Sequence, residues 1–266
     1  MRRAETRPRV VILGGTTEAR ELAAALAARH GESVEIVTSQ AGRTTRPRKV
    51  AGILRRGPLG GAAGLTRFLA AGRVAALIDA THPFAQAMKR NAVAAAQASG
   101  VPLLALHRPG WTRRAGDCWI EVDDAAAAVR ALARLGRRVF LTIGQRELDG
   151  FAAMRGRFFL VRVIERPAAF AFPDGELVLA RGPFRVADEL ALMRRARIDV
   201  LVTKASGGRA TYAKIAAARR LGIPVVMIRR TPPPQATAAA SLAVALAWVE
   251  RRLRAAVRRL DAVARR

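Results

Sequence analysis

The sequence predicts an α/β protein made of two similar halves, each a doubly wound parallel sheet covered by helices. Three observations lead to this prediction. Apolar runs rich in β-branched residues alternate with helical segments, glycines directly follow several of these runs, and the whole pattern restarts past the middle of the chain. With 266 residues, of which 51% are hydrophobic, the chain can bury one large core or two smaller ones.

The first strand and the turn after it, over residues 10–20, organise the N-terminal half. Four apolar residues predict a buried strand, which turns through Gly14 and Gly15 into a helix. Such a turn presents unpaired backbone N–H groups and a positive dipole end, and both attract phosphate. The dinucleotide fingerprint has three spaced glycines, but here Thr16 and Ala19 stand at the second and third positions. This stretch alone therefore leaves nucleotide binding and an ordinary tight turn both open.

The segment after the second strand bears on which nucleotide would bind. Residues 34–38 predict that strand, which ends near Ser39. In a dinucleotide site, an acid stands near this strand end when the ribose has a free 2′-hydroxyl. No Asp or Glu occurs from Ser39 to Gly52, whereas Arg43 and Arg46 do. The pattern favours the 2′-phosphate of NADPH, although a solvated basic loop would have the same composition.

The other elements follow the same alternation. In the first half we expect a strand over 50–54, a loop over 57–64, a strand over 74–78, a helix over 85–99 and a strand over 101–106. A linker is expected over 109–116. In the second half we expect strands over 138–144, 158–164, 177–180, 199–202 and 225–228, with a helix that ends at 221.

The two halves resemble copies of one another. An offset of 122 places Thr81 on Thr203, Gly100 on Gly222, Pro102 on Pro224 and Arg108 on Arg230; an offset of 129 places Arg9 on Arg138, Val10 on Val139, Gly15 on Gly144 and Glu18 on Glu147. We expect domains over 1–112 and 113–240, followed by an amphipathic, Arg-rich helix over 241–266. We expect this helix to pack on the protein itself, and the alternative is a dimer or anionic-lipid contact. Open α/β sheets bind ligands at the carboxyl ends of their strands, so two such edges facing each other would form a cleft.

Two residues at strand ends are the candidates for acid–base chemistry. Lys204 follows a buried strand and precedes Ser206-Gly207-Gly208, where it could hold an acidic ligand or donate a proton. His82, after Asp79, lies at another strand end. The alternatives are a solvated lysine in a structural turn and a structural histidine.

The net charge of +27 raises the question of nucleic acid. The arginines are scattered without interleaved aromatic residues, so we expect an acidic small molecule as the partner and no nucleic acid. No His or Cys cluster has metal-ligand spacing, so no metal is expected. No apolar run is long enough to span a membrane. A single cysteine, Cys118, favours a cytoplasmic protein.

Short motifs along the chain together resemble one enzyme family. They are Ile12-Leu13-Gly14-Gly15-Thr16-Thr17-Glu18-Ala19-Arg20, Asp79-Ala80-Thr81-His82-Pro83-Phe84-Ala85, Arg108-Pro109-Gly110-Trp111, Leu141-Thr142-Ile143-Gly144, Gly182-Pro183-Phe184, Thr203-Lys204-Ala205-Ser206-Gly207-Gly208 and Lys214-Ile215-Ala216-Ala217-Ala218-Arg219. In this order they resemble the precorrin-6A reductases of cobalamin (vitamin B12) biosynthesis. The resemblance covers about residues 10–230, and the family pattern Arg-Gln after Gly144 is here Gln145-Arg146.

The resemblance implies two Rossmann-like domains with NADPH and a tetrapyrrole polycarboxylate between them. It implies hydride transfer to a double bond of precorrin-6A, with protonation of the ring, to give precorrin-6B. The expected catalytic residues are Lys204 and His82. The expected cofactor-binding residues are Gly14, Gly15, Thr16, Thr17, Glu18, Ser39, Arg43, Arg46, Thr81 and Gly144. The expected substrate-binding residues are Arg108, Arg113, Arg181, Arg185, Ser206, Gly207, Gly208 and Arg209.

Two other functions stay open at this point. One is an NADP-dependent reductase of another acidic small molecule, and the other is a non-catalytic nucleotide- or nucleic-acid-binding protein. Hand-over contacts with other enzymes of the pathway are a further expectation for the partners of a reductase.

Overall fold

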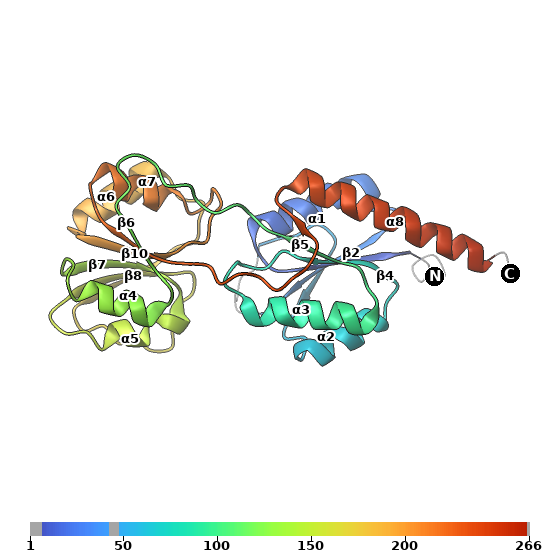
Figure 1. The fold of residues 1–266 in the computed structure, drawn as a ribbon, viewed down its shortest axis with the longest axis horizontal. Coiled ribbons are helices and arrows are strands. Elements are labelled where there is room, and N and C mark those ends of the chain that lie inside the picture. Colours follow the sequence, from blue (N-terminus) through green and yellow to red (C-terminus); the bar gives the residue numbers. More distant parts are fainter. Residues whose placement is uncertain (1–6, 43–47, 265–266) are drawn as a thin grey trace. The chain divides into compact units, whose positions relative to one another are not determined.

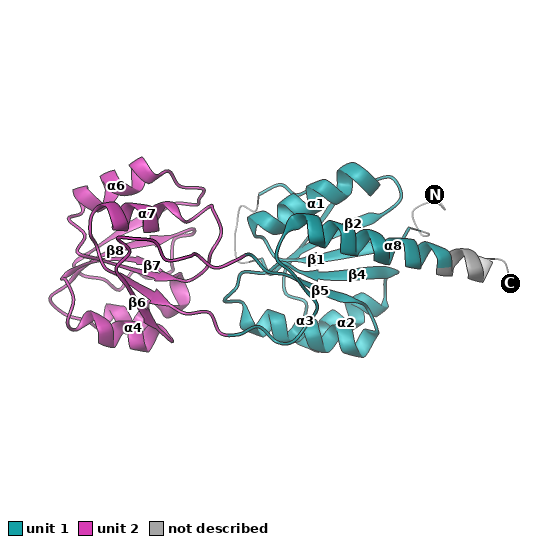
Figure 2. Ribbon diagram, turned by 45° about the horizontal axis from the view of Figure 1, so that its top comes forward, with its two compact units in different colours: residues 1–108, 232–266 teal, residues 109–231 magenta. Residues whose placement is uncertain are grey.

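The structure is a computed structural model that describes residues 7–42 and 48–264. The chain divides into two compact units, one formed by Met1–Arg108 with Pro232–Arg266 and the other by Pro109–Thr231 (Figure 2). The C-terminal segment from Pro232 thus belongs with the N-terminal unit, whereas the expected domains placed 232–240 with the second half and kept 241–266 apart. We call these two bodies unit 1 and unit 2.

Unit 1 is built on a fully parallel sheet of six strands. The strands are β1 (Arg9–Leu13), β2 (Glu35–Gln40), β3 (Ile53–Arg56), β4 (Val74–Asp79), β5 (Leu103–Leu106) and β12 (Ala238–Ala239), in the spatial order β12-β5-β4-β1-β2-β3. The helices are α1 (Thr17–His30), α2 (Gly61–Ala70), α3 (Gln86–Ser99) and α8 (Leu242–Ala264) (Figure 1).

Both faces of the unit 1 sheet are covered, which explains why its central strands are apolar throughout. On β1, Val10 and Ile12 pack with α1 and α8, whereas Val11 and Leu13 pack with α2 and α3. The C-terminal helix α8 contributes Trp248 and other buried residues to the first of these cores. The expectation that this helix packs on the protein's own body is therefore confirmed.

Unit 2 repeats the architecture with a second parallel sheet. Its strands are β6 (Trp119–Val122), β7 (Arg138–Thr142), β8 (Phe158–Val163), β9 (Gly175–Leu179), β10 (Val200–Lys204) and β11 (Val225–Ile228), in the order β6-β11-β10-β7-β8-β9. Its helices are α4 (Ala125–Leu132), the 3₁₀ helix η1 (Gln145–Glu147), α5 (Asp149–Ala152), α6 (Val186–Arg195) and α7 (Ala213–Arg220). Helices α6 and α7 cover one face, and α4 and α5 cover the other (Figure 1).

The predicted repeat is present in the two sheets. The offset of 129 carries β1 onto β7, and the offset of 122 carries β5 onto β11, residue by residue. One of the matches, that of Thr81 with Thr203, is not a structural equivalence. Asp79 pairs with Leu13 of β1, and Thr203 pairs with Thr142, the residue of β7 that corresponds to Leu13. Thr203 thus corresponds to Asp79 and not to Thr81. This difference becomes important for the two buried lysines described below.

The element predictions differ from the structure at several places: helices α4 and α6 were not predicted, and the strand expected over 50–54 lies at Ile53–Arg56. Residues 57–64 are not a loop throughout, because α2 begins at Gly61 after Gly60, whose φ of +76° lies in the left-handed region. The edge strands β6 and β12 were not predicted. They are short, with 4 and 2 residues, and β6 is only partly buried, so neither has an apolar run that would mark it.

Candidate functional site

The turn after β1 is the first candidate site. Gly14 has a φ of +122°, and a Cβ atom on it would lie 2.6 Å from the carbonyl oxygen of Ala80. Only glycine fits there, because the backbone of the β4–α3 loop passes directly against the turn. The neighbouring Gly15 has an exposed backbone, and a Cβ there would meet only the flexible side chain of Gln40.

Thr16 fastens this turn to both the helix and the next loop. Its hydroxyl accepts a hydrogen bond from the backbone N–H of Ala19 at 3.1 Å, as an N-cap does, and donates to the carbonyl of Ala80 at 2.9 Å. The fingerprint position that usually holds a second glycine is therefore occupied by the residue that caps α1. Residue Ala19, at the third position, is fully buried against the sheet.

A buried ion pair holds the loop that touches Gly14. The ammonium of Lys89, on α3, lies 3.1 Å from Oδ2 of Asp79, and both side chains are at most 5% exposed. The other carboxylate oxygen, Oδ1, accepts hydrogen bonds from the backbone N–H and the hydroxyl of Thr81 at 3.0 and 2.6 Å. The pair thereby orders Ala80 and Thr81, which form the far wall of the Gly14 turn.

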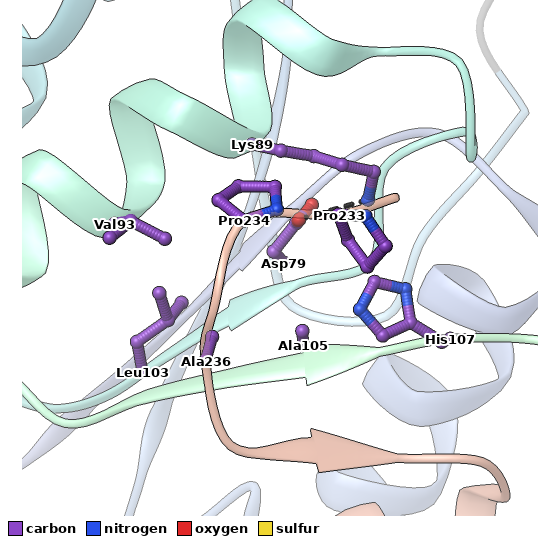
Figure 3. A pocket seen from close by; sticks show the side chains of 9 residues that line it. All are labelled: Asp79, Lys89, Val93, Leu103, Ala105, His107, Pro233, Pro234 and Ala236. Atoms are coloured by element: carbon purple, nitrogen blue, oxygen red, sulfur yellow. Dashed lines mark hydrogen bonds and ion pairs between the residues drawn. The ribbon is translucent and has the colours of Figure 1, made fainter. Parts of the chain in front are cut away.

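A small pocket opens beside this ion pair, at the C-terminal ends of β4 and β5 (Figure 3). Lys89 reaches down toward Asp79 on one side of it, His107 lies on another, and Pro233 and Pro234 of the returning chain close it. The return segment thus packs over the ion pair. Sequence analysis did not anticipate any of this, because Lys89 and Asp79 meet only when α3 packs beside β4.

Three further predicted residues of unit 1 lie near the C-terminal ends of its strands, around the Gly14 turn. Ser39 is buried at the end of β2, and its carbonyl accepts a hydrogen bond from the Gly14 N–H at 2.9 Å. Glu18 forms an ion pair with Arg108 at 3.3 Å. Burial lowers the pKa of Arg108, and the nearby Glu18 carboxylate partly opposes this shift. Arg108, which we expected to bind substrate, is therefore engaged with a residue of the α1 N-terminus.

His82 lies exposed on the β4–α3 loop. Its Nδ1 atom accepts a hydrogen bond from the backbone N–H of Phe84 at 3.3 Å, and the two rings lie 5.9 Å apart. An acceptor at Nδ1 places the proton of the neutral ring on Nε2, which is the tautomer suited to donation from that atom. A catalytic role for His82 stays a prediction.

In unit 2 the ionisable residue at the end of the central strand β10 is Lys204. It ends β10, and its ammonium lies 2.5 Å from Oε1 of Glu147, with side chains 15% and 33% exposed. The two residues are far apart in the sequence, and parallel pairing of β10 with β7 brings them together. Lys204 is therefore not a solvated lysine. Its counterion, Glu147, lies on the 3₁₀ helix η1.

Gly144 has a φ of +97°, and a Cβ on it would come no closer than 4.0 Å to Glu147. The chain continues from it into η1 and the four-residue helix α5, not into a long helix like α1. The helix-dipole argument that supports phosphate binding at Gly14 therefore does not extend to Gly144. Its role in cofactor binding stays a prediction.

The glycine loop after β10 is held in place by two side chains. The indole N–H of Trp111 donates to the carbonyl of Gly208 at 2.8 Å, and Nε of Arg230 donates to the carbonyl of Ala205 at 2.5 Å. Gly207 has a φ of +62°, and a Cβ on it would lie 2.2 Å from the Arg230 guanidinium. The side chains of Trp111 and Arg230 thus pack closely against this loop, and Ser206 is largely buried.

The predicted carboxylate-binding arginines of unit 2 lie on its surface. Arg185 and Arg209 are exposed, and Arg181 is half-buried. Arg113 is exposed and donates to the carbonyl of Asp117 at 3.4 Å. These side chains are accessible to an anionic ligand, and their roles in substrate binding stay predictions.

A buried charged cluster in unit 2 was missed by the sequence analysis. Arg162 and Glu189 form an ion pair at 2.5 Å, with side chains 6% and 2% exposed, and Lys214 is buried near them. The Arg162 guanidinium lies 3.9 Å from the ring centroid of Phe184. Burial, and to a lesser extent the positive charge of Arg162, lowers the pKa of Lys214 to about 7. We call these three charged residues the buried cluster.

Several expectations fall outside what the structure describes or concern absences. Arg43 and Arg46 lie outside the described residues. Among the residues that are described, no group of His, Cys, Asp or Glu could hold a metal ion. Within the same ranges, no helix has the length and apolar character needed to cross a bilayer.

The order β3-β2-β1-β4-β5-β12, together with a glycine turn into α1, is the strand order of the doubly wound α/β fold that many dinucleotide-binding domains share, and unit 2 is a second unit of the same topology. The comparisons with known proteins identify the family. The chain belongs to the precorrin-6x reductase CbiJ/CobK family, which matches residues 9–250.

Relatives and a solved structure agree with this assignment. A precorrin-6A reductase of Rhodococcus erythropolis is 53% identical over 91% of this chain and 97% of its own length. A cobalt-precorrin-6A reductase of Salmonella typhimurium is 30% identical over 84% of this chain and 88% of its own. The structure titled CobK precorrin-6A reductase is 43% identical, has a TM-score of 0.87, and covers 92% of this chain and 97% of that one. The resemblance and the α/β fold predicted from sequence are thereby confirmed.

Proposed function

We propose that this chain transfers a hydride from NADPH to precorrin-6A and thereby reduces one double bond of the macrocycle to give precorrin-6B. Membership of the family makes it an oxidoreductase acting on a CH–CH group of a tetrapyrrole, with a nicotinamide cofactor. The observation that carries the proposal is the Gly14 turn, where the backbone approaches so closely that no side chain fits, at the capped N-terminus of α1.

Unit 1 supplies the residues that would hold the cofactor. The backbone of Gly14 and Gly15 with the N-terminus of α1 would hold its phosphates, and Thr16 fixes the turn by its two hydrogen bonds. The bound nicotinamide supplies the hydride. Glu18 and Arg108 keep each other in place beside the same helix end, and Arg43 and Arg46 would contact the 2′-phosphate.

Unit 2 supplies the residues that would bind the substrate. Precorrin substrates carry several carboxylates, and guanidinium groups pair with carboxylates through two parallel hydrogen bonds. Arg209 directly follows the glycine loop, and Arg181 and Arg185 flank the segment whose Phe184 N–H donates to the carbonyl of Ala210 at 3.2 Å. Positive charge near a conjugated ring also favours its acceptance of a hydride. Arg113 and the loop Ser206-Gly207-Gly208 complete this proposed surface.

The reduction adds one hydride and one proton, so a proton-holding group is required. Lys204 is our candidate, because its ammonium is paired with Glu147 and its side chain remains 15% exposed at the end of β10. The Glu147 carboxylate fixes the position of the ammonium by this ion pair, and His82 is the second candidate. Both residues are placed at strand ends, where ligands of open α/β sheets bind.

The metal-free macrocycle is the form of substrate that we propose. The relative named for precorrin-6A is 53% identical, whereas the one named for the cobalt form is 30% identical. We further propose a cytoplasmic location, favoured by the single cysteine, and direct hand-over of the product to another enzyme of the pathway.

The decisive experiment is anaerobic incubation of the full chain with precorrin-6A and NADPH, followed at the nicotinamide absorbance. We expect oxidation of NADPH that depends on the macrocycle, with little turnover of the cobalt form. Lys204→Ala should lower kcat by roughly 10²-fold or more if Lys204 donates the proton. Cofactor binding without turnover of any corrin precursor would favour a reductase of another acidic molecule, and salt-dependent DNA retention without NADPH binding would favour a nucleic-acid-binding protein.

Specificity for NADPH has its own test. Replacing both Arg43 and Arg46 with alanine should weaken NADPH binding by roughly 10- to 100-fold, because each arginine would pair with the 2′-phosphate. NADH binding should change little, since it lacks that phosphate. Dissociation constants for the two cofactors, measured by fluorescence, give the comparison, and an equal loss for both would remove the assignment of these residues.

A further inference from the structure

Lysine is rare in this chain, and two of its lysines are buried at corresponding places in the two units. Only four of the 47 basic residues are lysines: Lys49, Lys89, Lys204 and Lys214. Lys89 lies in the first turn of α3, which follows β4, and Lys214 lies in the first turn of α7, which follows β10. Each strand occupies the same place in its sheet. The two lysines therefore lie in the first turns of equivalent helices of the repeat, although not at the same position in them.

The two lysines differ in their counterions. Lys89 is paired with Asp79, at the end of β4, whereas the position that corresponds to Asp79 in unit 2 is Thr203. No hydrogen bond joins the Lys214 ammonium to any of the residues that the structure describes. Its charged neighbours are Arg162 from β8, which disfavours the charge of Lys214, and Glu189 from α6, which favours it. Oε1 of Glu189 accepts from Arg162 at 2.5 Å, and its buried Oε2 has no hydrogen-bond partner among the described residues.

Lys214 lies directly beneath the proposed substrate-binding surface. Its Nζ atom lies 5.8 Å from the ring centroid of Trp111, and the indole N–H of that residue is hydrogen-bonded to the carbonyl of Gly208. One aromatic side chain thus separates the lysine from the glycine loop. On the other side of the buried cluster, Arg162 contacts Phe184, in the segment between Arg181 and Arg185.

We propose that Lys214 is a specificity-determining residue, whose ammonium adds a positive charge beneath the glycine loop and strengthens the binding of the substrate carboxylates. This inference rests on the proposed function. In the poorly screened interior, a buried charge acts over a longer distance than an exposed one does. Because Glu189 is paired with Arg162, a protonated Lys214 leaves the buried cluster with one net positive charge, whereas the charge of Lys89 is balanced by Asp79.

The pH dependence follows from the charge state. Burial lowers the pKa of Lys214 to about 7, so the residue is charged below that pH and neutral above it. Substrate affinity should therefore fall as the pH rises through 7. The substrate carboxylates titrate well below this range, and the 2′-phosphate of the cofactor titrates near 6 and affects the KM for NADPH instead.

The test is the KM for precorrin-6A between pH 6 and 9 at saturating NADPH, for the full chain and two variants. In the wild-type protein KM should rise by roughly 3- to 10-fold across pH 7, as expected for the loss of one partly screened charge. Lys214→Met should have the high KM at every pH and an unchanged KM for NADPH. Arg220→Met removes a positive charge from the exposed end of the same helix. In this variant the KM for precorrin-6A should still rise across pH 7 as it does in the wild-type protein.

A second readout is independent of turnover. Because the chain has only four lysines, selective ¹³C labelling of the lysine ε-carbons gives four NMR signals that can be titrated separately. The signal lost in Lys214→Met should titrate near pH 7. A midpoint near 10 for Lys214, or a KM step that persists in Lys214→Met, would overturn the inference. Absence of turnover by the wild-type protein at every pH would instead contradict the proposed function.

Discussion

Replacing Lys89 with methionine should lower the free energy of unfolding of unit 1 by about 3–5 kcal/mol, because it leaves the Asp79 carboxylate buried without its partner. The pair is almost completely excluded from solvent, and Asp79 also orders Thr81 through two hydrogen bonds. Denaturant unfolding followed by the fluorescence of Trp248, which is buried in unit 1, measures the loss.

Lys214→Met should raise the free energy of unfolding of unit 2, whereas Lys89→Met lowers that of unit 1. The folded-state pKa of about 7 lies below the ordinary value of 10.5, so between these pH values the unfolded chain binds a proton that the folded chain does not. Stability contributed by this group therefore rises with pH from 7 to 10.5. Below pH 7 burial of the lysine costs roughly 4–5 kcal/mol, so its replacement should stabilise unit 2 by up to a few kcal/mol.

The two lysines thus serve as matched variants of each other. Trp111 and Trp119 report the unfolding of unit 2, and the exposed Lys49 provides a third variant, Lys49→Met, that should change stability by less than about 0.5 kcal/mol. Equal destabilisation by Lys89→Met and Lys214→Met would contradict the distinction between a paired and an unpaired buried lysine.

Gly14→Ala should abolish most cofactor binding. The new Cβ would lie 2.6 Å from the carbonyl oxygen of Ala80, and the φ of +122° is strained for any L residue. Strain of about 1–3 kcal/mol and displacement of the loop that Thr16 bonds should together lower NADPH affinity by roughly 10²-fold or more. Isothermal titration calorimetry of the variant measures the change.

The control for this substitution is Gly100→Ala. Gly100 ends α3 with a φ of +69°, and nothing lies within 4 Å of a Cβ built on it. The variant should lose about 1 kcal/mol of stability and keep its cofactor affinity. If Gly14→Ala bound NADPH as the wild-type protein does, the assignment of this turn to the cofactor would fail.

Most of the fold could be predicted because its central strands carry a strong local signal. Strands β1, β4, β7 and β10 are covered on both faces, so each is a continuous apolar run, and glycine or a polar residue marks its end. The edge strands β6 and β12 have no such signal. β12 has only two residues, and it joins its sheet because the chain returns to β5 after unit 2, which no local pattern records.

The candidate site could be predicted at the level of strand ends but not of contacts. Lys204 and Glu147 were both noticed, yet their pairing depends on the register of β10 beside β7. Lys89, Arg162 and Glu189 were overlooked, because charged residues in helices and strands usually face solvent. The one available signal was the scarcity of lysine, which distinguishes the buried lysines from the many surface arginines.

The path of the chain has a consequence for how the molecule is made. Unit 2 is inserted between β5 and β12, so unit 1 lacks an edge strand and the helix α8 until the residues after Thr231 have been synthesised. The inserted unit is contiguous and has all six of its strands before then. On the ribosome, unit 2 should therefore complete its fold before unit 1 does. Until α8 has been synthesised, the apolar face of α1 that packs against it stays uncovered.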